Sequence, residues 1–363
     1  MEKPTFEAVY DFQNLLAAAE SAYESISKKK RLRAHVRLFM DHLEENLIEL
    51  QNELIWRTYR MGKFFMFKVY EPKERDIAAL PFRDRVVQIA LCNVIEPYID
   101  KRFIYDSYSS RKKKGQLAAA RRAAYFMSKP DCTKYIKCDI HKFFYSIDLY
   151  VLMMITRRYI DDEGILWLIE LIIREENPEK GIKLGNRFSQ PAANLYLNEL
   201  DFYMKQRLHV KYYVRFADDF LIFGRSKGQL QAYFEQVEAF LAEELHLKTN
   251  DKTRIGSCKD GVDFVGYQIY PNHMVIKKKS MQRTKHLLHG WMHSKVPDDT
   301  FAASIGSRCG HARGTVSYKF YNKILLRALF YEIKKYKEFE ARVSEAEASG
   351  QVKLLNRQDA NQD

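Results

Sequence analysis

Two adjacent carboxylates, Asp218 and Asp219, lie between two runs of β-branched and aromatic residues. Residues 211–216 alternate in character and residues 220–223 are apolar, which predicts a hairpin with both acids at its tip. Neighbouring carboxylates raise each other's pKa, so the pair costs free energy unless a cation such as Mg²⁺ neutralises it. Taken alone, such a pair is more often a solvated turn, so a metal site needs a further acid from elsewhere in the chain.

That further acid is Asp139, which ends a predicted short strand over residues 135–138 and is followed by aromatic residues. If this strand pairs with the hairpin in one sheet, Asp139 lies opposite Asp218. Two metal ions about 3.5–4 Å apart that promote in-line phosphoryl transfer need bridging carboxylates from separate backbone segments. The three acids therefore predict a two-metal site. Asp148 is expected to be a helix cap instead of a ligand.

The elements that must position these acids follow from apolar spacing. Apolar residues from Val36 to Leu54 recur at three- and four-residue steps and predict one long helix. Pro191, just after Ser189 and Gln190, marks the start of another helix. The remaining expected elements are a strand over 64–69, helices over 83–98, 116–127 and 228–246, two strands within 263–276, and helices from about 280 to 336.

Composition restricts the class of protein. The chain has 363 residues, of which 46% are hydrophobic and 29% charged, as expected for one multi-lobed globular unit or two small domains. The formal net charge is +13 and the pI about 9.3, which favours a polyanionic partner through counterion release. Aromatic residues, at 13%, add surface on which bases can stack.

The cysteines and the apolar runs indicate a compartment. Five cysteines without Cys-x-x-Cys spacing are typical of reduced thiols in a cytoplasmic protein, with neither a zinc site nor disulfides. The longest apolar run, residues 165–173, is interrupted by Glu170 and is too short to span a bilayer. The first residues lack the apolar core of a signal peptide. We therefore expect a cytoplasmic protein without a membrane partner.

Seven sequence blocks in a fixed order carry a resemblance to a known family. They are residues 69–75, 82–88, 111–115, 139–144, 185–190, 216–219 and 264–267. With these blocks the chain resembles a reverse transcriptase of the group II intron-like bacterial class, and most of all the reverse transcriptases of diversity-generating retroelements. The resemblance implies an α+β, right-hand polymerase architecture with fingers, a palm containing a small antiparallel sheet, and a helical thumb, after an N-terminal helical extension.

The resemblance also implies domain boundaries. It places the helical extension at residues 1–60 and the fingers at 61–135. The palm follows at 136–270, with a fingers insertion near 150–185. The thumb occupies 271–337, and a polar, flexible tail is expected over 338–363.

The sub-family assignment depends on Gly185-Asn-Arg-Phe-Ser-Gln190. The diversity-generating branch has Gly-Asn-x-x-Ser-Gln at this place, and Leu184 then stands where most related enzymes carry a glutamine that contacts the incoming nucleotide. Loss of that polar contact is expected to loosen discrimination. The branch copies RNA with errors at template adenines. Phe216-Ala217 and Lys112 depart from its usual pattern, which weakens the mutagenic assignment more than the polymerase one.

The resemblance assigns site residues in three groups. The expected ligands of two Mg²⁺ ions are Asp139, Asp218 and Asp219, together with Ile140. The expected nucleotide-binding residues are Lys73, Arg75, Arg111, Phe144, Leu184 and Gln190. The expected template and primer contacts are Asn186, Gly266, Tyr267, Lys277, Arg283 and Lys285. The Phe144 ring would exclude a ribose 2′-hydroxyl. Structural alternatives stay open for several of them: surface positions for the single cations, core packing for Phe144, and helix-start caps for Asn186 and Gln190.

The leading hypothesis is an RNA-directed DNA polymerase that uses deoxynucleoside triphosphates to make cDNA from an RNA template. Within it, the resemblance favours the error-prone enzyme of a diversity-generating retroelement, assisted by a ring of small basic helical accessory proteins. The alternatives are an antiphage or abortive-infection reverse transcriptase that copies a dedicated non-coding RNA, a non-catalytic maturase-like RNA-binding protein, and a primer-independent RNA polymerase.

Overall fold

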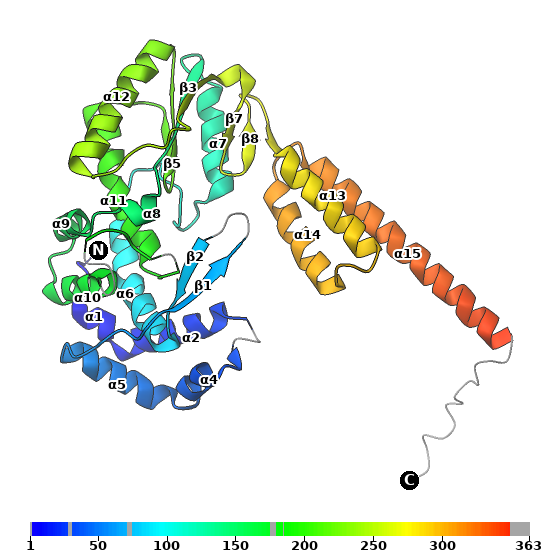
Figure 1. Ribbon diagram of the computed structural model, residues 1–363, viewed down its shortest axis with the longest axis horizontal. Helices are drawn as coiled ribbons and strands as arrows, with labels where there is room; N and C mark the ends of the chain where they lie inside the picture. Colours follow the sequence, from blue (N-terminus) through cyan, green and yellow to red (C-terminus); the bar gives the residue numbers. More distant parts are fainter. Residues whose placement is uncertain (1, 28–30, 71–74, 175–178, 184, 349–363) are drawn as a thin grey trace, which may run out of the picture. The chain divides into compact units, whose positions relative to one another are not determined.

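The computed structural model describes residues 2–27, 31–70, 75–174, 179–183 and 185–348. The chain divides into two compact units, residues 1–265 and 266–363, and each is considered by itself. Figure 1 shows the order of helices and strands along both units. No helix among the described residues is both long and apolar enough to cross a bilayer.

The N-terminal region is helical, as expected, but the long helix predicted from Val36 to Leu54 is interrupted. Its helices are α1 Phe6–Tyr10, α2 Phe12–Ser25, α4 Ala34–Asp41 and α5 Leu43–Ile55. His42, with φ −119° and ψ 45°, separates α4 from α5. Val36, Phe39 and Leu47 are still buried on both sides of the break. The apolar spacing therefore identified the buried face correctly, while the backbone bends to keep that face on the core.

The following region supplies a hairpin and two helices. They are β1 Phe65–Val69, β2 Arg75–Ala79, α6 Phe82–Asp100 and α7 Gln116–Met127. The two strands pair antiparallel, with Phe65 opposite Ala79. Helix α6 is buried along most of its length and packs against α2, so it forms the centre of the first unit. The helices expected over 83–98 and 116–127 are confirmed.

Within the described residues, four antiparallel strands form the larger sheet of the first unit, in the order β4-β5-β3-β6. Their bounds are β3 Lys134–Asp139, β4 Tyr213–Phe216, β5 Asp219–Gly224 and β6 Arg254–Ser257. One face, which carries Cys138, Phe220 and Ile222, belongs to the large core. On the other face the Phe223 ring lies against Phe126 of α7, with 6.0 Å between ring centroids. Both faces are therefore covered by apolar side chains.

Further helices of the first unit surround this sheet. They are α8 Phe143–Ser146, α9 Leu149–Tyr159, α10 Glu163–Arg174, α11 Ser189–Phe202, which continues into a π-turn at Tyr203–Arg207, and α12 Lys227–Glu244. Strand β7, Val262–Phe264, ends the unit after a short 3₁₀ turn at Cys258–Asp260. Asp148 caps α9 by accepting hydrogen bonds from the amides of Tyr150 and Val151, which confirms the predicted cap. Helix α11 begins at Ser189 as predicted.

In its described part, residues 266–348, the second unit is a hairpin followed by three helices. Its elements are β8 Tyr267–Ile269, β9 Met274–Ile276, α13 Lys278–Met292, α14 Asp298–Ala312 and α15 Tyr318–Ala348. Stacking of Trp291 on Phe301, with 4.3 Å between ring centroids, ties α13 to α14. The first part of the tail expected from residue 338 is helical, because α15 continues through Ala348; its flexibility stays a prediction. Residues 349–363 lie outside the described part.

Candidate active site

The three predicted acids meet where strand β3 ends and strand β5 begins. Asp139 is directly opposite Asp219 in the antiparallel ladder. The Ile140 amide donates to the carbonyl of Asp218 at 3.3 Å, so the chain after β3 stays beside the hairpin turn. Directly opposite residues project their side chains on the same face of a sheet. The fold therefore places Asp139 and Asp219 as neighbours, with Asp218 on the adjoining turn.

The hairpin turn consists of Ala217 and Asp218, because Phe216 pairs with Asp219. Ala217 has φ +53°, in the left-handed region that alanine rarely adopts. Two-residue hairpin turns need positive φ at a central position, because only then does the turn match the twist of the strands. The prediction of an acid pair at a hairpin tip is thus confirmed. The left-handed conformation of Ala217 in this turn costs free energy and must be stabilised by its surroundings.

Asp219 lies in an environment that perturbs its pKa. Its side chain is 24% exposed, and Lys137 Nζ lies 3.0 Å from its Oδ2. Burial raises the pKa of Asp219 to about 7; Lys137 opposes the rise, while the charges of Asp139 and Asp218 add to it. Among the described residues, its buried Oδ1 finds no hydrogen-bond donor. A buried carboxylate oxygen without a donor is a group that a bound cation would satisfy.

Asp139 is held by a segment that the sequence did not single out. The Asn250 amide donates to the Asp139 carbonyl at 2.7 Å, and Asn250 Nδ2 donates to Asp139 Oδ2 at 3.4 Å. Next to it, Ile140 forms an isolated bridge with Thr249, and the His141 amide donates to the Lys248 carbonyl at 2.8 Å. Residues 248–250 therefore fix the backbone after β3. No local pattern marks this segment, since it meets Asp139 only in the fold.

The donor set suits Mg²⁺, since hard carboxylate oxygens from two backbone segments converge at one end of the sheet. Across the residues that the structure describes, no three histidine, cysteine, aspartate or glutamate side chains are arranged as a ready-made metal site. In this structure Lys137 occupies one carboxylate oxygen of Asp219 through an ion pair. Asp139, Asp218 and Asp219 are the residues that would hold the metal.

The expected sugar-selecting aromatic lies close behind Asp139 in the chain. Phe144 is in α8, is half-buried, and packs edge-on against Phe143 with 5.5 Å between centroids. The turn before α8 contains Lys142 at φ +43°, and the Phe144 carbonyl accepts from the Ile182 amide at 2.8 Å. Phe144 therefore packs in part against the core while a portion of the ring stays exposed. Its role in selecting the sugar stays a prediction.

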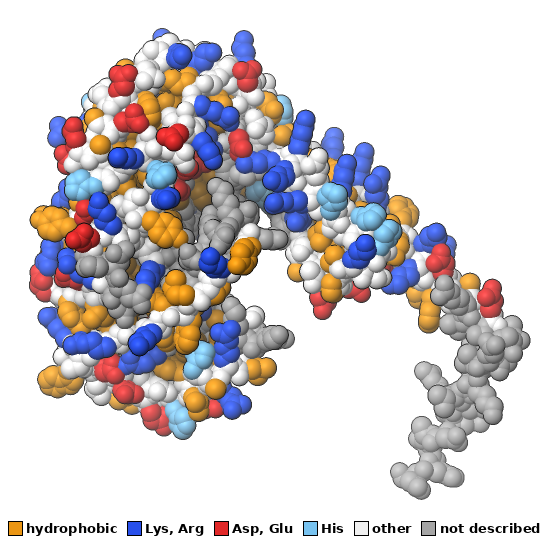
Figure 2. All heavy atoms as spheres, in the orientation of Figure 1, with side chains coloured by type: hydrophobic (Ala, Val, Ile, Leu, Met, Phe, Trp, Pro, Cys, Tyr) orange, Lys and Arg blue, Asp and Glu red, His pale blue; other side chains and the backbone are white. Residues whose placement is uncertain are grey.

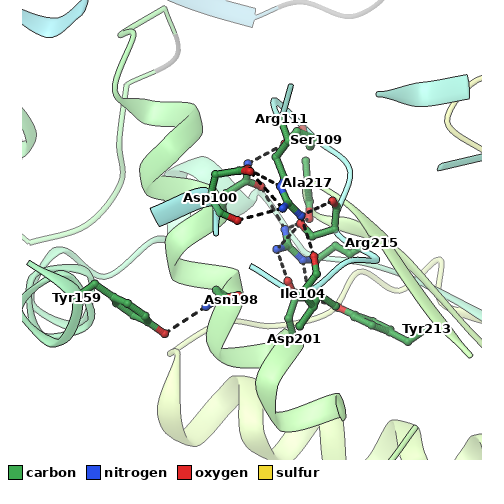
Figure 3. A network of polar contacts seen from close by, with 12 residues as sticks. Asp100, Ile104, Ser109, Arg111, Tyr159, Asn198, Asp201, Tyr213, Arg215 and Ala217 are labelled. Carbon is green, nitrogen blue, oxygen red and sulfur yellow. Dashed lines mark hydrogen bonds and ion pairs between the residues drawn. The ribbon is translucent and has the colours of Figure 1, made fainter. Parts of the chain in front are cut away.

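The Arg111 guanidinium is bonded to its own loop and to Asp100, which argues against its predicted contact with the triphosphate. Its Nε donates to Asp100 Oδ1 at 2.5 Å, and its Nη1 donates to the carbonyls of Ile104 and Ser107 at 2.7 and 2.9 Å. Its Nη2 donates to the Asp100 carbonyl at 3.1 Å. With the side chain only 9% exposed and every nitrogen bonded to the chain, Arg111 anchors the loop before α7 (Figure 3).

The structure describes only some of the other nucleotide-binding candidates. Lys73 and Leu184 lie outside the described residues, and Arg75 is described only as backbone of β2. Gln190 is in the first turn of α11, where its Oε1 accepts from Ser110 Oγ at 3.1 Å. This contact joins the start of α11 to the loop that carries Arg111.

The template and primer candidates divide between the two units. Asn186, in the first unit, is buried, and within the described residues its Oδ1 has no hydrogen-bond donor. In the second unit Gly266 has φ +92°, and the Tyr267 hydroxyl donates to the His311 carbonyl at 2.9 Å. Three basic candidates lie at the start of α13 or along it: Lys277, Arg283 and Lys285. In Figure 2, Lys and Arg side chains gather over this unit.

Two further charged residues that belong to none of the seven sequence blocks' assigned positions contact the site. Lys137 is two residues before Asp139 in β3, and the two-residue period of a strand could have placed both on one face. Arg215 is fully buried in β4, and its Nη1 donates to the carbonyl of Ala217 in the turn. Its position before the acids was visible in the sequence, but its partner Asp201 was not.

Comparison with known proteins now assigns the family. Residues 70–269, more than half of the chain, match the family described as reverse transcriptase (RNA-dependent DNA polymerase). The chain therefore belongs to the reverse transcriptase family, whose enzymes are RNA-directed DNA polymerases acting on an RNA template and DNA. Enzymes of this family generally depend on Mg²⁺. Mixed helices and small antiparallel sheets agree with their right-hand fold.

Individual relatives are distant. The chain is 26% identical over 295 residues to Protein YkfC of Escherichia coli (strain K12), an alignment that covers 66% of this chain and 73% of that protein. It is 22% identical over 276 residues to the putative COX1/OXI3 intron 2 protein of Saccharomyces cerevisiae (strain ATCC 204508 / S288c), with 56% of this chain and 32% of the yeast protein covered. The chain thus spans about a third of the yeast protein.

One solved structure that the comparison matches to this chain is telomerase from Candida albicans, in complex with a TWJ fragment of telomeric RNA. It has a TM-score of 0.46 and 11% sequence identity, and the match covers 78% of this chain and 61% of that one. At this score the likeness adds nothing to the family assignment.

Proposed function

We propose that this chain makes cDNA from an RNA template by two-metal phosphoryl transfer, with Asp139, Asp218 and Asp219 as the metal-binding residues. The observation that carries the proposal is the register of the sheet, which sets Asp139 opposite Asp219 with Asp218 on the adjoining turn. Segments about eighty residues apart in sequence thereby bring three carboxylates to one end of a covered sheet. The substrates are deoxynucleoside triphosphates and a primer end paired to RNA.

The chain's own contribution is mainly positioning and electrostatic stabilisation, as phosphoryl transfer requires. Two Mg²⁺ ions, when bound, would stabilise charge on the attacking and leaving oxygens. Asn250 holds Asp139, and Lys137 favours the ionised form of the half-buried Asp219. Phe144 blocks the space for a 2′-hydroxyl and so favours deoxynucleotides. In this proposal residues 61–135 form the fingers, 136–270 the palm and 271–337 the thumb.

Primer extension by the full chain tests the function directly. Purified protein with primed RNA template, Mg²⁺ and deoxynucleoside triphosphates should extend the primer, and Asp218→Ala should abolish extension. A matched control is Asp260→Ala, which removes an exposed carboxylate of the same unit and should leave extension intact. Equal extension by the wild type and Asp218→Ala would overturn the proposal.

Within this class, the diversity-generating retroelement role is the favoured one. Its support is the Gly185-to-Gln190 block, whose Ser189 begins α11 and donates from Oγ to the Lys183 carbonyl at 2.6 Å. The role includes errors at template adenines, through Leu184, and a ring of basic helical accessory proteins as partner. Sequencing of cDNA made on a defined RNA tests it: errors confined to template adenines are expected, and errors spread evenly over the four bases would contradict the role.

The second candidate is an antiphage or abortive-infection reverse transcriptase that copies a dedicated non-coding RNA. Phe216-Ala217 and Lys112 favour it, because these residues depart from the diversity-generating pattern. The gene neighbourhood discriminates the two: a variable-repeat target gene supports the first role, and a defence island supports the second. The yeast relative's printed name describes an intron protein, and a non-catalytic maturase-like role would be indicated by RNA binding without extension.

A further inference from the structure

A buried arginine, Arg215, binds the hairpin turn that consists of Ala217 and Asp218. Arg215 is fully buried, and all its side-chain nitrogens donate hydrogen bonds. Nε and Nη2 donate to Oδ1 and Oδ2 of Asp201 at 2.8 and 2.5 Å, which is a two-point ion pair. Nη2 also donates to Ser107 Oγ at 3.1 Å, while Nη1 contacts Asn194 Oδ1 at 3.4 Å. The remaining bond runs from Nη1 to the carbonyl of Ala217 at 3.1 Å (Figure 3).

That carbonyl belongs to the peptide unit that joins Ala217 to Asp218. A peptide unit is planar, so a fixed carbonyl also fixes the amide nitrogen through which Asp218 is attached. Ala217 has φ +53°, a conformation that a non-glycine residue keeps only when its surroundings enforce it. The Arg215 bond is such a restraint, because it acts on the strained residue itself.

Arg215 is itself immobilised from two sides. Its backbone amide donates to the Asp106 carbonyl at 2.9 Å, and its carbonyl accepts from the Tyr108 amide at 3.0 Å. The loop that supplies these groups is anchored by Arg111, whose Nη1 donates to the Ser107 carbonyl. Asp201, in α11, receives a third bond from the Tyr213 hydroxyl at 2.7 Å. The turn is thus restrained by a guanidinium with little freedom of its own.

We propose that Arg215, anchored by Asp201, is a positioning residue that holds the Ala217 carbonyl and thereby sets the direction of Asp218. The inference rests on the proposed function of Asp218 as a metal-binding acid. It gives the buried ion pair a role in catalysis beyond folding. Neither Arg215 nor Asp201 contacts substrate in this scheme, and both act through the turn.

The test must separate positioning from stability, because truncation of one partner leaves the other as an unpaired buried charge. The double variant Arg215→Met with Asp201→Leu removes both charges and keeps apolar volume, which proteins often tolerate. Arg215→Lys keeps a charge for Asp201 but loses the guanidinium fork. The matched control is Arg225→Met, which removes an exposed, ion-paired arginine just after the same hairpin.

Hydrogen–deuterium exchange of the full chain gives a readout that does not depend on polymerase activity. Amides of the peptide over residues 213–224 should exchange about tenfold faster in the double variant. Those of α12 should be unchanged, and Arg225→Met should match the wild type throughout. Exchange at wild-type rates in this peptide, in the double variant or in Arg215→Lys, would overturn the inference whatever the activity. A wild type that extends no primer would instead count against the proposed function.

Kinetics supply the second readout. In the double variant kcat should fall about 100-fold, since a displacement of about 1 Å in a catalytic group has this effect, while KM for the nucleotide changes little. Arg215→Lys should be intermediate in both kcat and exchange. A purely structural role predicts instead that kcat follows the melting temperature of the variants. That correlation, with turn exchange unchanged, would refute positioning.

Discussion

Lys137 Nζ lies 3.0 Å from Oδ2 of Asp219, at the end of the sheet where the three acids meet. Lys137 also donates to the Asp263 carbonyl at 2.7 Å, so its ammonium is held in place beside the carboxylate. Burial and two neighbouring acids raise the pKa of Asp219 to about 7, and Lys137 is the main influence that lowers it. The lysine therefore supports the ionised form of an acid that the fold would otherwise favour in its neutral form.

The first prediction concerns Lys137→Met and the pH dependence of activity. Loss of the ammonium should raise the pKa of Asp219 further, so that ionisation of this acid requires a higher pH. The acidic limb of the kcat/KM profile should move upward by about half a pH unit or more at low Mg²⁺. The control is Lys134→Met, which removes a lysine paired with Gly224 at the other end of β3. Superimposable profiles for Lys137→Met and the wild type would contradict the assignment.

The second prediction concerns Asp219→Asn and stability without metal. The folded-state pKa of Asp219, about 7, is above the ordinary value of 3.8, so the folded chain retains a proton that the unfolded chain has lost. The wild type therefore loses stability as pH rises through this window, and the neutral amide does not. In EDTA the free energy of unfolding of Asp219→Asn, taken relative to the wild type, should increase by about 2 kcal/mol between pH 5 and pH 8.

Thermal or urea unfolding at both pH values measures this difference. Addition of Mg²⁺ should favour the wild type, because only the carboxylate offers a strong ligand. A gain in stability that is the same at pH 5 and pH 8 would show that Asp219 does not carry the shifted pKa.

The third prediction concerns Phe144→Ala and the choice of sugar. Removal of the ring opens space for a 2′-hydroxyl, so the preference for deoxynucleotides over ribonucleotides should fall about tenfold or more. Single-nucleotide incorporation, measured as kcat/KM for each nucleotide, gives the ratio directly. Phe143→Leu, which alters the buried neighbouring ring, serves as the control and should keep the ratio. If the ratio of kcat/KM for deoxynucleotides to that for ribonucleotides is unchanged in Phe144→Ala, the ring only packs against its neighbours and does not select the sugar.

The fourth prediction tests the packing of the N-terminal region with a pair of glycines. A Cβ on Gly164 of α10 would lie 2.4 Å from ring carbons of Phe6, so Gly164→Ala should destabilise the fold by about 1–3 kcal/mol. A Cβ on Gly228 of α12 would meet nothing within 4 Å, and Gly228→Ala should stabilise the fold by about 0.5–1 kcal/mol. Equilibrium unfolding in urea measures both. Stabilisation by Gly164→Ala would mean that α10 and α1 do not pack in this way.

Local patterns were sufficient for much of the fold. The hairpin around Asp218 and Asp219, the strand that ends at Asp139 and the cap at Asp148 follow from side-chain alternation and helix-start chemistry, which act over a few residues. The helix expected from Val36 to Leu54 was wrong as a single element, because apolar spacing reports which face is buried and not whether the backbone is continuous. A bend at His42 leaves the spacing intact.

Contacts between remote segments could not be derived in this way. The motif assigned Arg111 to the triphosphate, whereas the fold surrounds it with Asp100 and the carbonyls of its own loop. Asn250, Lys137 and Asp201 carry no signature, because each gains its role only from a partner brought close by the packing of other elements.

The sequence by itself determined which acids could bind metal. It also determined that two of them share a hairpin tip, because residue type and local periodicity can be observed directly in the sequence. Only the tertiary structure decided that Asp139 faces Asp219, that Lys137 pairs with that acid, and that Arg215 reaches the turn. Strand register and buried ion pairs depend on which segments collapse together. That choice minimises the free energy of the whole chain, and no short stretch of residues contains it.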